Sequence, residues 1–323
     1  MDFFAKTDTS ASFFTVMLVL GVIFINGFTD APNSISGVIS SKIWSKNKAC
    51  ILSGLFNFLG VIASALTGAR VADHLLSIVD FGEHSTCGVW AALITVIIFG
   101  ISAWAFAMPS SESHALISSV FGVSLAIGIK NTADFGVLIT AMMLSSLSAF
   151  IFSLILGKIF KKSGDTCIKY EKLASLGSSF MHGAQDGQKF MALLLLASPF
   201  SNAESKVNIL FIALLVGVFM LLGTLAGGGK IIDSLGNDIV RNTEKIAFLS
   251  DFSTTVSVFI CSILGFSVST GNIKACSLIG AGLGENERIN KETVIKIIFT
   301  SVITFPICIG LGFVFASLLI RLF

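Results

Sequence analysis

The chain has 323 residues, of which 54% are hydrophobic and only 12% are charged, and its formal net charge is +2. A soluble domain carries about 25% charged residues, so this composition excludes an ordinary soluble protein and predicts an all-α polytopic membrane protein. The near-neutral charge gives no sign of a nucleic-acid partner. The six cysteines show no paired spacing, so we expect neither a disulfide framework nor a metal cluster.

Apolar runs of membrane-spanning length recur along the whole chain. The first ten residues lack a basic region and the apolar run after them is long, so no secretory signal is expected. The first five crossings are expected at 12–41, 49–68, 88–108, 110–129 and 134–157. After a polar loop, five more are expected at 173–198, 207–226, 246–266, 268–283 and 293–320. The runs 110–129 and 268–283 are short and Gly-rich, and we expect re-entrant or broken helices there.

Charged loops predict the orientation of the chain. Lysines dominate 42–48 and 158–172, whereas acidic residues dominate 70–83. The positive-inside rule places the two lysine-rich loops in the cytoplasm and both termini outside. Because five crossings per half is an odd number, the second half must be inverted relative to the first. We therefore predict two inverted-topology repeats, 1–157 and 173–323, joined by a cytoplasmic linker at 158–172.

Two polar stretches interrupt the first crossing of each half, at 26–33 and 182–189. Each contains a Gly followed three residues later by an aspartate, and Asp30 and Asp186 are 156 residues apart. A carboxylate at the centre of a membrane helix costs roughly 2.5–3.5 kcal/mol on insertion scales. One buried acid can be a structural contact between helices, but a matched pair favours a functional site between two copies of one unit.

A hydroxyl cluster precedes the fourth apolar run of each half. Ser110, Ser111 and Ser113 form the first, and Ser269 and Thr270 belong to the second, with 158 residues between Ser111 and Ser269. Helix N-termini are expected here, and their free N–H groups and dipole favour an anion. Two such ends facing each other would suit a tetrahedral oxyanion. Each hydroxyl alone is a weak signal, since Ser and Thr often bond back to their own helix in membranes.

Charge counting suggests a transport mechanism. A divalent oxyanion beside two aspartates would place up to four negative charges in a low-dielectric pocket. Na+ or protons would have to enter with it, so coupled symport is the hypothesis, with an uncoupled anion channel as the alternative. His182 and Asp186 are four residues apart but lack an evident third metal ligand, and Lys189 could bind the anion or pair with Asp186. The His-Glu-x-x-His motif of a metalloprotease is absent, so no enzyme is predicted.

The two signatures resemble those of the inorganic phosphate transporter (PiT) family. The quoted stretches are Asn-Gly-Phe-Thr-Asp-Ala-Pro-Asn at 26–33 and His-Gly-Ala-Gln-Asp-Gly-Gln-Lys at 182–189, and segments at 56–60, 223–228 and 291–306 agree as well. The likeness runs nearly end to end and is strongest to the bacterial low-affinity branch. It implies a phosphate transporter of the bacterial cytoplasmic membrane, with Na+ or H+ as coupling ion and no other cofactor. Low-affinity members favour protons. Lipid and a homodimeric partner are the other contacts expected.

The resemblance also implies site residues. Substrate-binding residues would be Ser110, Ser111, Ser113, Gln185, Gln188, Ser269 and Thr270. Coupling-ion residues would be Thr29, Asp30, Asn33, Asp186 and Asp251. This chain departs from the family pattern at Glu112, where Thr is usual. Glu112 could face away, carry a proton, or mark a changed substrate, and sulfate is the alternative substrate that the family offers.

Overall fold

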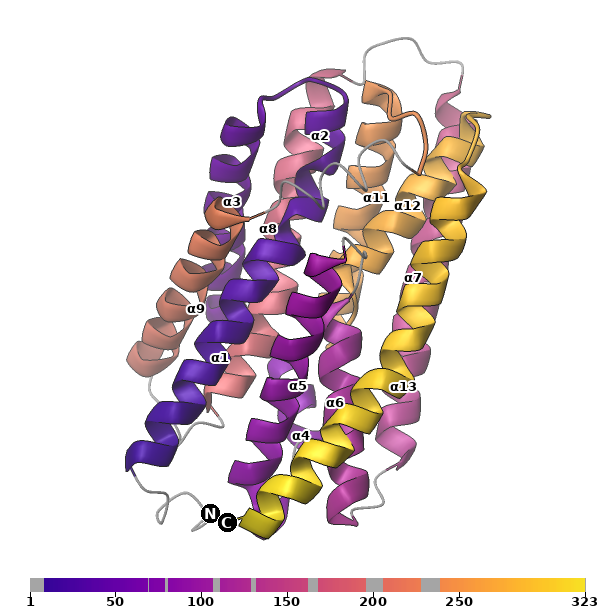
Figure 1. Cartoon of the computed structure of the whole chain (residues 1–323). Coiled ribbons are helices and arrows are strands. Elements are labelled where there is room, and N and C mark those ends of the chain that lie inside the picture. Colours follow the sequence, from indigo (N-terminus) through magenta and orange to yellow (C-terminus); the bar gives the residue numbers. More distant parts are fainter. Residues whose placement is uncertain are drawn as a thin grey trace.

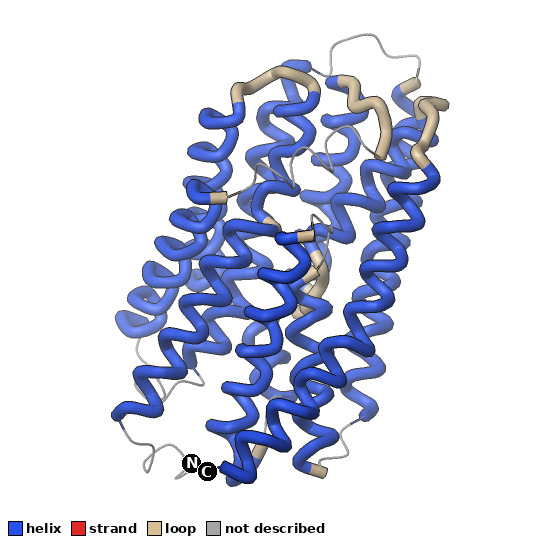
Figure 2. The backbone as a smooth tube through the Cα atoms, viewed as in Figure 1, coloured by secondary structure: helices blue, strands red, loops and turns tan. Residues whose placement is uncertain are grey.

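A computed structural model describes residues 9–68, 70–78, 81–106, 111–128, 132–161, 168–195, 206–227 and 239–322. Within these ranges the chain is a bundle of helices joined by short loops, and no β-strand is assigned (Figures 1 and 2). The first half comprises α1 (Thr9–Thr29), η2 (Ala31–Ile35), α2 (Ser36–Ser40), α3 (Lys46–Thr67), α4 (Arg70–Ile78), η3 (Gly82–His84), α5 (Ser85–Ala105), α6 (Glu112–Ile127) and α7 (Thr132–Phe160). The second comprises α8 (Ile168–Leu195), α9 (Lys206–Ala226), α11 (Glu244–Ile263), α12 (Thr270–Gly284) and α13 (Lys291–Leu322).

Seven helices of the described part are long and apolar enough to cross a membrane, and the chain is therefore a multi-pass membrane protein. Three of the ten expected crossings fall outside this group. With 28 residues, α8 is long enough to cross, but it carries the polar signature. With 16 and 15 residues, α6 and α12 rise only about 24 Å and about 22 Å, less than the roughly 30 Å of a hydrocarbon core.

The two short helices belong to hairpins. The helices α5 and α6 enter and return at one end of the bundle, and α11 and α12 do the same at the other end (Figure 1). The N-termini of α6 and α12 therefore meet near the middle of the molecule. Asn272 Nδ2 lies 3.4 Å from His114 Nδ1, which joins the first turns of the two helices. This arrangement matches the re-entrant interpretation of 110–129 and 268–283.

The two interrupted crossings differ in structure. The first breaks after Thr29, where a short 3-10 segment carrying Pro32 separates α1 from α2. Proline has no N–H to donate and its ring clashes with the preceding turn, which ends the helix. The expected interruption at 182–189 is wrong, because α8 continues through it without a break. That stretch has glycines but no proline, and glycine alone weakens a helix by only about 1 kcal/mol.

Helices of the two halves correspond in order and run in opposite directions. The helices α1 and α8 begin at opposite ends of the bundle (Figure 1). The helices α6 and α12 both begin near its middle and run toward opposite ends. The first helix of each half also packs against the second long helix of the other half. A methyl group on Gly27 of α1 would collide with the Met220 carbonyl of α9, and one on Gly183 of α8 would collide with the Asn57 carbonyl of α3. The first half thus packs on the second through two similar close contacts, and the inverted repeat stays a prediction.

The termini and the lysine-rich loops lie at different ends of the bundle. The first turn of α1 and the last turn of α13 lie at the end that also holds α4, whereas the loops 41–45 and 285–290 lie at the opposite end (Figure 1). The lysine-rich end is thus opposite the termini. The predicted linker 158–172 is partly helical, since α7 ends at Phe160 and α8 begins at Ile168.

Candidate functional site

The hydroxyl clusters cap the two hairpin helices. Ser111 Oγ accepts the backbone N–H of His114 at 3.2 Å, and Ser269 Oγ accepts that of Asn272 at 3.2 Å. Both serines are buried N-cap residues. A capped N-terminus with its dipole pointing inward favours negative charge. The prediction of two facing helix N-termini is thus confirmed for Ser111 and Ser269, whereas Ser110 lies outside the described residues.

An ion pair ties the two N-termini together. Lys189 Nζ of α8 donates to Asp186 Oδ1 at 2.6 Å, to Ser113 Oγ of α6 at 2.5 Å and to the Val268 carbonyl before α12 at 2.6 Å. The Asp186 carboxylate also accepts Asn26 Nδ2 of α1 at 3.0 Å. Lys189 and Asp186 are both almost fully buried. Of the two sequence interpretations of Lys189, the structure has the pairing with Asp186, and this pair joins the first signature to the second.

Glu112 faces into the same site. Its Oε1 lies 2.7 Å from the Thr29 hydroxyl, and its Oε2 has no hydrogen-bond partner although the side chain is buried. It borders a small cavity with Asn26, Ser113 and Lys189. The interpretation that Glu112 faces away is therefore wrong. An acid at this place adds a third carboxyl group to those of Asp30 and Asp186.

His182 contacts the second hydroxyl cluster. Its Nδ1 lies 2.9 Å from Thr270 Oγ1 and 3.6 Å from Asp186 Oδ2, while its Nε2 is buried without a hydrogen-bond partner. No third acid, histidine or cysteine joins His182 and Asp186 among the residues that the structure describes. The pair therefore orients Thr270 at the N-terminus of α12.

Asp30 and Asn33 line a second small cavity, on the side of the hairpin ends that faces α2. His182, Thr270 and Lys274 also border it, together with hydroxyl residues; the remaining lining consists of Ser34, Ser178, Thr254 and Val258. This cavity and the one beside Glu112 each offer only about 10 Å³ to the centre of a water molecule. That is room for about one water, so a five-atom oxyanion could enter only after the surrounding helices move apart.

Two predicted substrate ligands have other partners. Gln185 Nε2 donates to the Phe266 carbonyl at 2.8 Å, and its Oε1 accepts a short hydrogen bond from Ser262. Gln188 Oε1 accepts the Val71 N–H of α4 at 3.0 Å, and its amide donates to its own helix. Both side chains hold neighbouring backbone in place, and this geometry gives no support to their role as substrate ligands.

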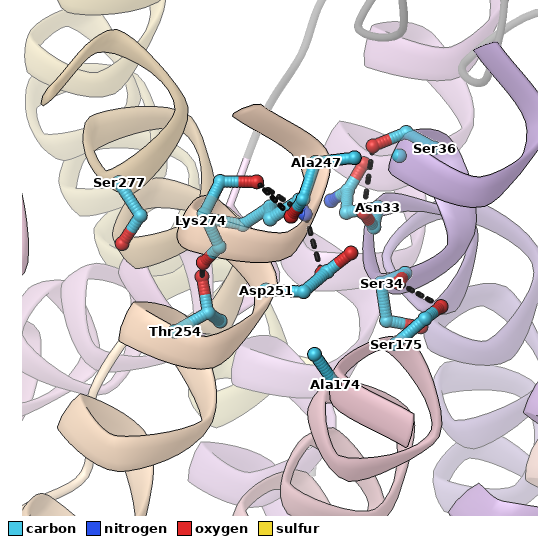
Figure 3. A network of polar contacts seen from close by, with 12 residues as sticks. Asn33, Ser34, Ser36, Ala174, Ser175, Ala247, Asp251, Thr254, Lys274 and Ser277 are labelled. Carbon is cyan, nitrogen blue, oxygen red and sulfur yellow. Dashed lines mark hydrogen bonds and ion pairs between the residues drawn. The ribbon is translucent and has the colours of Figure 1, made fainter. Parts of the chain in front are cut away.

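Asp251 lies in a separate buried cluster that reasoning from the sequence missed in part. Its Oδ1 accepts a short hydrogen bond from Lys274 Nζ, which also donates to Ser250 Oγ at 3.1 Å. In Figure 3, Asp251 projects from α11 between Lys274 on one side and Ser34 and Ser175 on the other. Glu171 of α8 reaches the same place and is fully buried. A lysine inside an apolar run is the signal for Lys274, whereas the sequence places Glu171 in the predicted polar linker 158–172.

Known proteins resemble this chain over nearly its whole length. The model of the phosphate transporter family matches residues 26–174 and 166–312. A probable low-affinity inorganic phosphate transporter of Bacillus subtilis (strain 168) is 28% identical over 317 residues, covering 92% of this chain and 93% of the relative. One of Rhizobium meliloti (strain 1021) is 29% identical over 277 residues, covering 80% and 81%.

A solved structure has the same fold. It is described as the sodium-dependent phosphate transporter and superimposes with a TM-score of 0.86 at 17% sequence identity, over 98% of this chain and 100% of the other. This likeness confirms the arrangement of the helices. Since the family model matches most of the sequence, the chain belongs to the phosphate transporter family, whose members are transporters rather than enzymes.

Proposed function

We propose that this protein imports inorganic phosphate by symport with Na+ or protons. The observation that carries the proposal is the set of charges at the facing N-termini of α6 and α12. Asp30, Glu112 and Asp186 bring three carboxyl groups there, against the ammonium groups of Lys189 and Lys274, and Lys274 is already paired with Asp251. The helix ends suit an oxyanion, but the carboxyl groups outnumber the ammonium groups.

This excess of acid is the reason for coupling. Two unit charges 4 Å apart interact by about 4 kcal/mol at the effective dielectric of roughly 20 that suits protein sites. An entering phosphate would meet repulsion of this order from each ionised carboxylate that lacks a counter-charge. A cation or proton on Asp30 lowers that repulsion, so anion and cation bind best together. An uncoupled channel would derive no benefit from these acids.

Glu112 favours phosphate over sulfate. Near neutral pH a phosphate ion carries at least one O–H group, whereas sulfate carries none. A buried carboxylate oxygen without a partner, such as Glu112 Oε2, can accept a hydrogen bond from phosphate but only repels sulfate. Hydrogen bonds to charged groups contribute about 1.5–3 kcal/mol. The departure from the family pattern at Glu112 therefore supports phosphate as the substrate.

Alternating access follows from the small cavities and the two hairpins. The α5–α6 and α11–α12 hairpins approach the site from opposite ends of the bundle (Figure 1). In an inverted repeat, movement of one set of elements opens the site to one side and the equivalent movement opens it to the other. The lysine-rich end would face the cytoplasm and the termini would lie outside, in the cytoplasmic membrane of a bacterium.

Uptake of labelled phosphate into proteoliposomes tests this function. The full chain is reconstituted and given an inward Na+ gradient at equal pH or, separately, an inward proton gradient without Na+. Accumulation above equilibrium under either gradient supports symport and names the ion. We expect Asp186→Asn to abolish accumulation, because it removes the carboxylate that joins Asn26 and Lys189.

The control variant is Glu285→Gln, which removes an acid paired with Lys245 away from the site and should leave accumulation unchanged. Labelled sulfate is tested in parallel. Downhill phosphate flux that neither gradient can concentrate would show a channel, and accumulation of sulfate in place of phosphate would assign the other substrate.

A further inference from the structure

A second buried ionic cluster lies where α8, α11 and α12 meet α2. It consists of Glu171, Asp251 and Lys274, whose exposed fractions are 0%, 0% and 4%. Lys274 pairs with one oxygen of Asp251. With both acids ionised the cluster would carry one uncompensated negative charge, which is costly in a dry interior.

The two carboxyl groups converge on one glycine of α2. A Cβ atom on Gly37 would lie 2.9 Å from Asp251 Oδ2 and 3.1 Å from Glu171 Oε1. Asp251 Oδ2 and both oxygens of Glu171 have no hydrogen-bond partner. Ala247 closes the same spot from α11 at 3.2 Å. Two of these acceptor atoms, Asp251 Oδ2 and Glu171 Oε1, therefore face one spot that is too tight even for a methyl group, and such a spot admits a proton more readily than a hydrated metal ion.

Lys274 also belongs to the cavity on the other side. It borders the space lined by Asp30, His182 and Thr270, at the N-terminus of α12. The same ammonium group can therefore pair with Asp251 or with an anion in that cavity. An anion that draws Lys274 away leaves both acids of the cluster without a cation.

We propose that Lys274 moves from Asp251 to the bound phosphate, and that the Glu171–Asp251 pair takes up one proton in exchange. This inference rests on the proposed function and identifies protons as a coupling ion. One proton from water binds a carboxylate oxygen of the pair as the ammonium group leaves, and it returns to water when phosphate departs. The proton replaces the positive charge of Lys274, so the net charge around the two carboxyl groups is the same with and without bound phosphate.

Few other charged groups face this pair. On α12 the group is Lys274, and on α11 Glu244 adds a negative charge at longer range. The described residues of η2 and α2 contribute hydroxyl, amide and apolar side chains, as the sequence 31–40 shows. The proton affinity of the pair is therefore governed by where Lys274 lies.

The test is the pH dependence of phosphate binding to the purified full chain in detergent. Binding that takes up one proton weakens about tenfold for each pH unit above the pKa of the accepting group. Phosphate titrates as well, but it does so equally in every variant. We expect the double variant Glu171→Gln with Asp251→Asn, which removes both proton acceptors, to lose the tenfold weakening per pH unit that wild type shows beyond the titration of phosphate. We expect Lys274→Gln to weaken binding at least tenfold and to lose the same pH dependence, because no cation then leaves the pair.

The control is Glu292→Gln, an exposed acid in the first turn of α13, which should keep the wild-type slope. Lys274→Gln decides the test if the double variant does not yield a monodisperse protein. A folded double variant, or a folded Lys274→Gln protein, that keeps the wild-type slope would overturn this inference alone. Wild-type protein that binds neither phosphate nor sulfate at any pH would instead overturn the proposed function, and this inference with it.

Discussion

Breaking the Lys189–Asp186 ion pair by removing one of its partners should strongly destabilise the protein. Lys189 makes three hydrogen bonds of 2.5–2.6 Å, and its side chain is only 2% exposed. Lys189→Gln removes the ammonium group and leaves the Asp186 carboxylate buried at 1% exposure with one amide donor from Asn26. Removing one partner of a buried ion pair costs about 3–5 kcal/mol, and we expect a loss of free energy of unfolding in this range.

A double variant separates the charge from the shape. In Asp186→Asn with Lys189→Gln, both charges are gone and two amides of similar size remain. We expect this protein to lose less stability than either single variant, because no unpaired charge is left. The comparison pair is Lys245–Glu285, with a 2.9 Å contact and side chains 18% and 14% exposed. Water screens it in part, and Lys245→Gln should cost about 1 kcal/mol or less.

The free energy of unfolding of the four variants and of wild type can be measured in mixed micelles, without any transport assay. Circular dichroism follows unfolding during a titration with sodium dodecyl sulfate. The reasoning is refuted if Lys189→Gln costs no more than Lys245→Gln. It is refuted as well if the losses of the two single variants add up in the double variant, since additivity means that the two groups do not interact.

Three further variants test other parts of the structure. Gly183→Ala places a methyl group against the Asn57 carbonyl and should lower the free energy of unfolding by about 1–3 kcal/mol. Its control is Gly136→Ala, whose methyl group meets nothing within 4 Å and should not destabilise the protein; thermal unfolding in detergent compares the two. Glu112→Gln should lower the preference for phosphate over sulfate about 10–100-fold in competition for uptake, and an unchanged preference would contradict the selectivity argument. Gln185→Ala should lower stability by about 1–3 kcal/mol through two lost buried hydrogen bonds, yet leave phosphate affinity within about twofold; a selective loss of affinity would restore its predicted role as a ligand.

The sequence predicts the framework well, because the membrane makes strong demands on composition. The apolar runs, the interruption at 26–33 and the helix starts at the two hydroxyl clusters are each predicted from neighbouring residues alone. The continuous α8 shows where such reasoning fails. Its signature resembles the first one, but the proline that breaks the first helix has no counterpart there.

The partners of charged groups could not be predicted in this way. Glu171 lies in a polar stretch between Lys169 and Lys172 and looks like a solvated loop residue, yet it is fully buried in α8. Lys274 lies in an apolar run, and its partner Asp251 comes from another helix. Such pairs depend on how helices far apart in the sequence face each other, which no local pattern contains.

The charges also explain why an inverted repeat need not work equally in both directions. At the proposed repeat spacing, Lys189 corresponds to Asn33, and Glu112 corresponds to Thr270. The neutral groups that cap the two hairpin helices are alike, whereas the ammonium group belongs to one half and the extra acid to the other. Two conformations related by the repeat would have equal energy only if these groups were exchanged as well. In the alternating-access mechanism proposed above, the outward-open and inward-open forms would therefore differ in electrostatic energy, and ions or protons bound at Asp30 and the Glu171–Asp251 pair would shift the balance between them.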